Sequence, residues 1–184
     1  MKYIRNLLFL AIAILGFSTI EAQAQRYTKN ENISRQTIEW KVFKEIITLP
    51  HYGVFDHIAF KINGGTVTLF GKVTDGRNRR DAERFVEDID GVSNVVNNIE
   101  ILPASGFDNS IRRRIVQSFS DKGLYRYLWE PKPSVRIIVD GGHVSLEGYV
   151  ANRGDYNLMK ILAIGADGVF TVKNNLVIEK EMVR

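Results

Sequence analysis

Two stretches of the chain have almost the same sequence, and together they decide the fold. Residues 63–73 read NGGTVTLFGKV, and residues 140–150 read DGGHVSLEGYV, 77 positions later. The match continues without a gap, so that residues 58–101 correspond to residues 135–178 and the sequence DGV recurs at 90–92 and 167–169. A constant offset over this length indicates a tandem duplication. Because only two copies are present, each long enough for its own core, a solenoid is not indicated.

Hydrophobic spacing predicts that each copy begins with a helix followed by a strand. The helical stripes, with spacings of three and four, are Ile38, Val42, Ile46 and Leu49 in the first copy and Ile111, Ile115, Val116 and Phe119 in the second. Asp108 or Ser110 is the expected N-cap of the second of these helices. Alternating apolar residues at 58–62 and 135–139 predict the strands.

The quoted stretches predict a tight hairpin after each strand. Asn63-Gly64 and Asp140-Gly141 favour a type I′ turn, in which both central residues have positive φ. Gly71 and Gly148 lie inside the returning strands, where a glycine weakens pairing. We therefore expect a packed helix to approach closely there, or a bulge to re-aim the strand.

A second helix and a last strand complete each copy. The helix is expected over residues 77–88 in the first copy, and its apolar stripe in the second copy is Leu158, Ile161, Leu162 and Gly165. Gly91 and Gly168 are expected to end these helices in the left-handed conformation. The last strands are expected at 92–102 and 169–178. The predicted structural glycines are Gly64, Gly71, Gly91, Gly141, Gly148 and Gly168.

The sequence thus predicts an α+β fold with two tandem α-β-β-α-β units. Each unit is a three-stranded mixed sheet packed against two helices. We place the first unit at residues 37–102 and the second at residues 110–180. Residues 103–109, which contain the sequence PASG, form the expected linker.

The N-terminal residues have the pattern of an export signal. Lys2 and Arg5 precede an apolar run at residues 7–17, and Ala22-Gln23-Ala24 has the small-x-small pattern of a cleavage site. The run is shorter than the ~20 residues that span a bilayer core, although an uncleaved anchor is the alternative. We expect residues 1–24 to be a signal peptide, residues 25–36 a polar segment, and the product to be periplasmic.

The composition argues against catalysis. There is no cysteine, and the three histidines lack the spacing of metal ligands. The double glycines open strands and lack the continuation of a phosphate-binding loop. We therefore expect no catalytic residues, no metal site and no cofactor. Nucleic acid is also disfavoured as a partner, because the chain has an export signal and a formal net charge of only +4.

At these residues the chain resembles the BON family of bacterial envelope domains. The family pattern of a G-x-V-x-L-x-G hairpin arm and a later G-V-x-x-V-x-N is present as GTVTLFG at 65–71 and GVSNVVN at 91–97. The second copy has GHVSLEG at 142–148 and GVFTVKN at 168–174, but its helix has YNLM at 156–159 in place of a charged stretch. The resemblance implies a non-catalytic periplasmic protein that associates with phospholipid surfaces or acts in envelope stress.

Charge and aromatic residues point to the second copy as the membrane-facing one. Residues 36–102 have a formal charge of −2, whereas residues 103–184 have +3. The segment KGLYRYLWEPK at 122–132 interleaves aromatic and basic residues, as an interfacial anchor does. The predicted lipid-binding residues are Arg112, Arg113, Arg114, Tyr125, Arg126, Tyr127 and Trp129.

Two alternatives remain open from the sequence. The aromatic residues of this segment could instead seal the core, and the three arginines could be an ordinary solvated helix face. The protein could also be an adaptor or holdase-like module that binds envelope proteins. We therefore expect an anionic phospholipid surface as the partner, with envelope proteins as the alternative.

Overall fold

The computed structural model describes residues 37–129 and 132–179 of the 184-residue chain. The predicted signal peptide and polar segment, residues 1–36, lie outside the described residues. In the first copy, a helix over residues 37–47 precedes β1 (His57–Asn63), β2 (Thr66–Val73), α2 (Gly76–Glu87) and β3 (Asn94–Ile101). In the second, the elements are α3 (Gly106–Asp121), α4 (Arg126–Trp129), β4 (Val135–Asp140), β5 (His143–Val150), α5 (Arg153–Ile164), β6 (Thr171–Asn174) and β7 (Val177–Ile178).

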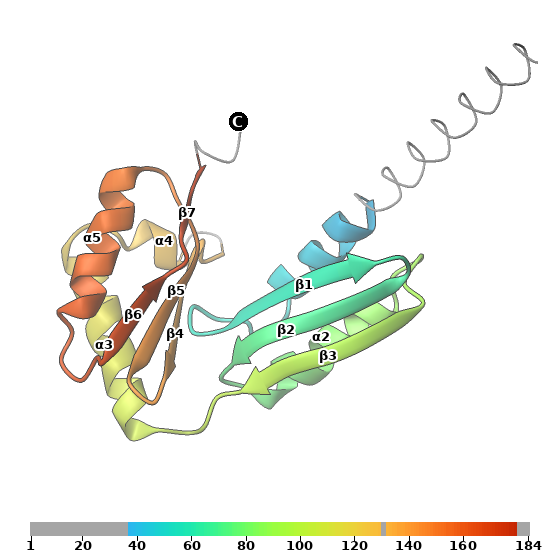
Figure 1. Cartoon of the computed structure of the whole chain (residues 1–184), viewed down its shortest axis with the longest axis horizontal. Helices are drawn as coiled ribbons and strands as arrows, with labels where there is room; N and C mark the ends of the chain where they lie inside the picture. The colour runs from blue at the N-terminus through green and yellow to red at the C-terminus, as the bar shows by residue number, and fades with distance from the viewer. Residues whose placement is uncertain (1–36, 130–131, 180–184) are drawn as a thin grey trace, which may run out of the picture. The chain divides into compact units, whose positions relative to one another are not determined.

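The two copies have the same sheet topology. β1 pairs antiparallel with β2, which pairs in parallel with β3. In the second copy β4 pairs antiparallel with β5, and β5 pairs in parallel with both β6 and β7, which divide between them the place of β3. Figure 1 shows α3 and α5 together on one face of their sheet. The α+β fold with tandem copies is confirmed.

Each core forms where the apolar side of the sheet meets the helices. In the first copy, Val67 and Leu69 of β2 are buried with Ala82 and Val86 of α2. The helix over residues 37–47 buries Val42 and Ile46, two residues of its predicted stripe. In the second copy the core contains Ile111, Ile115, Phe119, Ile137, Leu146, Met159 and Ala163.

The hairpin turns are shifted by one residue from the prediction. Asn63 pairs with Thr66 and Asp140 pairs with His143, so the central residues of the turns are the glycines that follow Asn63 and Asp140. Gly141 and Gly142 have φ of 57° and 80°, whereas in the first copy Gly64 has a φ of 60°. No non-glycine residue in the described part of the chain has a positive φ. The asparagine and aspartate therefore end the strands, because two glycines supply the turn at no steric cost.

The glycines inside the strands face a neighbouring backbone rather than a helix. Gly71 and Gly148 have φ of 127° and 106°. A Cβ on Gly71 would lie 2.2 Å from the carbonyl oxygen of His57, and a Cβ on Gly148 would lie 2.0 Å from that of Ser134. The pairing of β1 with β2 keeps one-to-one register past Gly71, so a bulge does not explain it. Both predicted causes were wrong, because it is the adjacent strand that leaves no room for a side chain.

The glycines after α2 and α5 lie beyond the helix ends. α2 ends at Glu87 and α5 at Ile164, whereas the residues with positive φ are Gly91 and Gly168. These glycines form turns three to four residues later, closed by bonds such as that from Val92 N to Ile89 O at 3.0 Å. The predicted left-handed conformation is confirmed, but not the role of ending the helix.

The apolar stripe of α5 also differs from the prediction. Met159 and Ala163 are buried, Leu162 is half-buried, and Ile161 is 64% exposed. Met159 and Ala163 occupy the positions 77 residues after Ala82 and Val86, so the repeat itself gives the correct stripe. The predicted Leu158 and Leu162 do pack, half-buried, against the core. Ile161 and Gly165 are exposed, because the prediction followed hydrophobicity within one helix instead of the offset between copies.

α3 begins earlier than predicted, at Gly106, inside the expected linker. Its N-cap is Ser105, whose hydroxyl accepts from Asp108 N at 3.1 Å. Asp108 is not the cap. Its buried carboxylate accepts from the backbone N–H groups of Gly141 and Gly142 at 3.0 and 2.9 Å, which ties α3 to the hairpin turn.

A loop of the first copy packs into the second. Val54 belongs to the core cluster of the second copy, and its carbonyl accepts from Ile137 N of β4 at 2.8 Å. Nη1 of Arg136 donates to the carbonyl of Gly53 at 2.6 Å. This loop covers part of the outer side of β4, an edge strand whose backbone groups would otherwise be open to pairing.

Candidate functional site

The predicted lipid-binding segment is positioned by the end of α3. Gly123 has a φ of 76°, its N–H donates to Ser120 O at 3.0 Å, and Leu124 N donates to Phe119 O at 2.9 Å. These two bonds are those of a Schellman motif, in which the residue after the glycine also packs against the last turn. Leu124 and Phe119 are both buried. The motif reverses the chain at Gly123 and directs the next residues into α4.

α4 is anchored on one side and exposed on the other. Leu124 and Leu128 belong to the core cluster of the second copy. Tyr125 is 54% exposed and Trp129, four residues later, is 60% exposed. Tyr125 directly precedes α4 and Trp129 ends it, so both exposed rings flank this short helix. The segment therefore packs into the core with its leucines and also exposes an aromatic pair. From the sequence, these two roles were alternatives.

Tyr127 is buried and holds α4 against the start of α5. Its hydroxyl donates to the carboxylate of Asp155 at 2.5 Å and accepts from Ala151 N at 3.2 Å. The guanidinium of Arg126 donates to the Tyr127 hydroxyl and to Asp155, and these bonds raise the pKa of Arg126. Tyr127 is thus unavailable to a membrane surface, whereas Arg126 remains exposed beside Tyr125 and Trp129.

Arg112 is also buried, so its expected place on a lipid-facing surface was wrong. It is 4% exposed, and its guanidinium donates to the carbonyl of Val139 and to the side chain of Asn109, both at 2.6 Å. Burial lowers the pKa of Arg112, an effect that Asp108 opposes. Arg112 fixes α3 to β4, where it covers a carbonyl of the edge strand.

Arg113 and Arg114 are exposed on α3 but lie apart from α4. Arg113 bonds to the hydroxyl of Ser110, and Arg114 donates to the carbonyl of Asp167 at 3.1 Å. Arg114 is seven residues before the end of α3, which is about 10 Å along the helix axis. The seven predicted residues therefore divide into an α4 group (Tyr125, Arg126 and Trp129), a pair on α3, and the buried Arg112 and Tyr127.

A second set of exposed apolar residues on the same copy was not predicted from the sequence. Ile161 and Ile164 on α5 are 64% and 55% exposed, and Phe107 and Phe170 are also exposed. The rings of Phe107 and Phe170 lie 6.0 Å apart. A signal was available in the sequence, since the positions 77 residues before Ile161 and Ile164 are Arg84 and Glu87, ordinary residues for a solvated face.

The structure gives no indication of a metal centre in the part of the chain that it describes. Across residues 37–129 and 132–179, no group of three or more His, Cys, Asp or Glu side chains could hold a metal ion. In the same residues, no helix is long and apolar enough to cross a membrane.

The tandem units and their glycine-bearing hairpins agree with a known family. The model of the BON domain matches residues 34–103 and 108–180. The chain belongs to the BON domain family. BON is a non-catalytic domain family, and this chain contains two BON domains in tandem.

Comparisons with individual proteins give little information beyond the family assignment. No curated protein matches the chain. Two solved structures of CdsD, a structural protein of the type III secretion system of Chlamydia trachomatis, are similar at 12% and 13% identity. The matches cover 80% and 75% of this chain and 95% of each CdsD chain, with a TM-score of 0.31 in both cases.

Proposed function

We propose that this protein is a non-enzymatic, periplasmic BON-domain protein that associates with anionic phospholipid surfaces. Its physiological role would be envelope maintenance or the response to envelope stress. The non-catalytic nature of the BON family supports the absence of enzymatic activity. The export signal in the sequence supports the periplasmic location. The observation that carries the proposal is the exposed pair Tyr125 and Trp129, which flank the anchored helix α4.

The α4 group has the chemistry of an interfacial anchor. Tyrosine and tryptophan rings favour the headgroup level of a bilayer. Lys122 and Arg126 are both exposed, and each basic residue near an anionic surface adds ~1 kcal/mol of attraction. Because the buried leucines fix the backbone of α4, presenting the two rings costs little conformational entropy. Arg113 and Arg114 would extend the basic area along α3.

Flotation with vesicles tests the proposal. The protein, from residue 25 onward, is mixed with phosphatidylcholine vesicles or with vesicles that also contain phosphatidylglycerol, at low and high salt. We expect binding only to the anionic vesicles, weakened by salt because the Debye length falls from ≈10 Å at 0.1 M to ≈3 Å at 1 M. Trp129→Ala should weaken binding about tenfold, and Arg113→Gln about fivefold.

Matched changes in the first domain serve as controls. Val96→Ala removes an exposed apolar side chain from β3, and Arg80→Gln removes an exposed cation from α2. Both variants should bind vesicles as the unmodified protein does. If the folded protein does not float with anionic vesicles, or if the control variants lose as much binding as Trp129→Ala, the proposed membrane site is wrong.

An adaptor role is the second candidate, and one observation favours it. β3 is an eight-residue edge strand, and Glu100 is its only charged residue. An edge of this kind is a template for pairing with a strand of another protein. Binding to envelope proteins through this edge would persist in lipid-free solution, whereas the proposed membrane association requires anionic lipid.

A further inference from the structure

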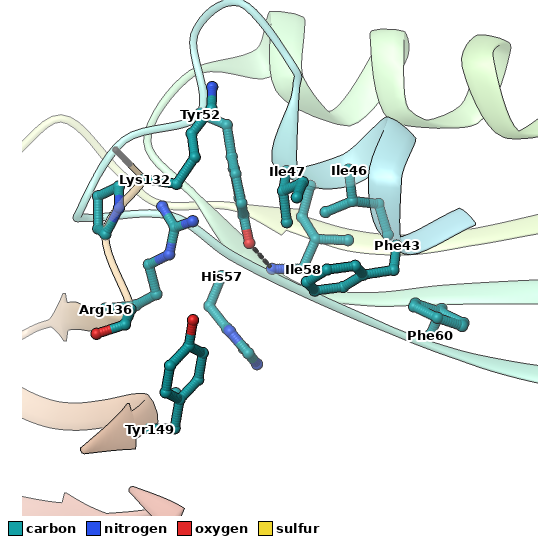
Figure 2. A pocket seen from close by; sticks show the side chains of 13 residues that line it. Phe43, Ile46, Ile47, Tyr52, His57, Ile58, Phe60, Lys132, Arg136 and Tyr149 are labelled. Carbon is teal, nitrogen blue, oxygen red and sulfur yellow. Dashed lines mark hydrogen bonds between the residues drawn. The ribbon is translucent and has the colours of Figure 1, made fainter. Parts of the chain in front are cut away.

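A pocket at the junction of the two BON domains lies away from the proposed membrane site. Its walls come from the helix over residues 37–47 and β1 of the first domain, and from residues 132–136 and β5 of the second. The cavity has a volume of about 200 Å³. Figure 2 shows Arg136, His57 and Tyr149 toward one end, with the Arg136 guanidinium turned toward Tyr52, while Phe43 and Phe60 lie toward the other end.

The polar end contains a buried cation without a close counterion. Arg136 is 6% exposed, and its guanidinium lies 4.2 Å from the centre of the Tyr52 ring. Its hydrogen bond to Gly53 uses one of five N–H groups. Among residues 37–129 and 132–179, no carboxylate lies within ion-pair distance of it. Buried charges are ordinarily paired, because an isolated one is costly.

Asp56 attracts Arg136 electrostatically, but no ion pair joins the two in the described part of the chain. The buried carboxylate of Asp56 accepts from Gly53 N, Thr74 N and Asn78 Nδ2 at 2.8, 2.6 and 3.3 Å. Glu147 acts on His57 and accepts from Asn175 at 2.6 Å. Lys132, which also lines the pocket, adds a second positive charge. The polar end is therefore complementary to an anion.

The remaining walls are suited to a hydrocarbon chain. Ile46 and Ile58 are buried beneath Phe43, Ile47 and Phe60, and the hydroxyl of Tyr52 is occupied by the N–H of Ile58 at 2.8 Å. The volume is below the ~300 Å³ at which pockets for drug-sized ligands begin. The small volume and the apolar walls favour a single hydrocarbon chain.

We propose that this pocket binds an amphiphile with one hydrocarbon chain and an anionic head, with the head between Arg136 and Tyr149 and the chain among Ile47, Phe43 and Phe60. A fatty acid and a single-chain lysophospholipid share this chemistry, the first with a carboxylate and the second with a phosphate. The pocket is separate from α4, so this proposal does not rest on vesicle binding.

Calorimetric titration of the protein, from residue 25 onward, tests the proposal. The probes are dodecanoate, a lauroyl lysophosphatidylglycerol, dodecyltrimethylammonium and inorganic phosphate, each below its micelle concentration. We expect saturable one-to-one binding of dodecanoate, of the lysophospholipid, or of both. The relative affinity of these two distinguishes a carboxylate from a phosphate head. The cationic amphiphile and phosphate alone should bind at least tenfold more weakly, because each lacks one half of the recognition.

Variants locate the ligand without depending on Arg136, whose replacement would also disturb the loop at Gly53. Ile47→Trp fills the apolar end and should weaken dodecanoate binding by more than tenfold. Tyr149→Phe should weaken it about tenfold through the lost hydrogen bond to a charged head. Trp129→Ala should leave dodecanoate binding unchanged although it reduces vesicle binding. Equal binding of the cationic amphiphile, binding without saturation, or unchanged binding by Ile47→Trp would overturn the proposal.

Discussion

The outer faces of α2 and α5 show how the two BON domains have diverged on one scaffold. α2 presents Arg84 and Glu87 to solvent, and Arg84 pairs with Asp81 at 3.4 Å. At the corresponding positions of α5 the second domain has the exposed Ile161 and Ile164. The buried sides of the two helices follow the same offset. The scaffold thus constrains the buried side of the helix and leaves its outer side to differ between copies.

The segments between the first helix and the first strand have diverged in length as well. Residues 48–56 connect them in the first domain and residues 122–134 in the second. The shorter connection turns inward and places Val54 in the core of the second domain. The longer one contains α4 and turns Tyr125 and Trp129 outward. The same point in the fold therefore joins the domains in one copy and offers a surface in the other.

The strand glycines are where the two domains should be most alike. Gly71→Ala and Gly148→Ala each place a Cβ against a carbonyl oxygen at 2.2 and 2.0 Å and force alanine into a positive φ. We expect each to lower the free energy of unfolding by more than about 3 kcal/mol. Urea unfolding followed by circular dichroism measures this loss. Gly106→Ala, where a Cβ meets nothing within 4 Å, should change stability little.

A marked difference between Gly71→Ala and Gly148→Ala would break the comparison. It would mean that one sheet can widen between its first two strands and the other cannot. Equal losses would show that the close approach of these strands belongs to the repeated scaffold itself.

A buried aspartate in each domain gives the second prediction. Asp56 accepts from Gly53 N and Thr74 N in the first domain, and Asp108 accepts from Gly141 N and Gly142 N in the second. Replacing either one by alanine leaves buried donors without an acceptor and should cost about 2–3 kcal/mol. Asp121→Ala, at the exposed end of α3, is the matched control and should cost less than about 0.5 kcal/mol by the same unfolding measurement.

Periodicity and the repeat predicted most of the fold, because buried positions must alternate or recur wherever a core exists. They located the two main helices of each copy, the hairpins, and six of the eight glycines that have positive φ in the described residues. What they missed depends on contacts between segments distant in sequence. The burial of Arg112 requires a carbonyl on β4, and the burial of Tyr127 requires Asp155 on α5. The pocket was equally invisible, since Tyr52 and Arg136 meet only in the folded chain.

The exchange of the outer helix residues sharpens the comparison of α2 with α5. Ile161→Arg combined with Ile164→Glu gives α5 the residues of α2 and adds no net charge. We expect stability to change by less than about 0.5 kcal/mol, because both positions are exposed. Flotation with anionic vesicles should weaken about fivefold if these side chains contribute apolar contact beside α4. Unchanged flotation would confine the membrane site to α4 and α3.

The smallest expected effect concerns His57, whose counterpart in the second domain is Ser134. Burial lowers the pKa of His57, with a further contribution from Arg136 and an opposing one from Glu147. The folded protein therefore binds a proton at His57 less readily than the unfolded chain, so this residue reduces stability as the pH falls through 6.5. His57→Ser should remove that part of the pH dependence, measured as the difference in unfolding free energy between pH 7.5 and pH 5.5. His143→Gln, at an exposed site, should retain it. An identical pH dependence in His57→Ser and the unmodified protein would show that the junction of the two domains tolerates a charged imidazole. The polar end of the pocket would then be more open to water than the burial of His57 indicates.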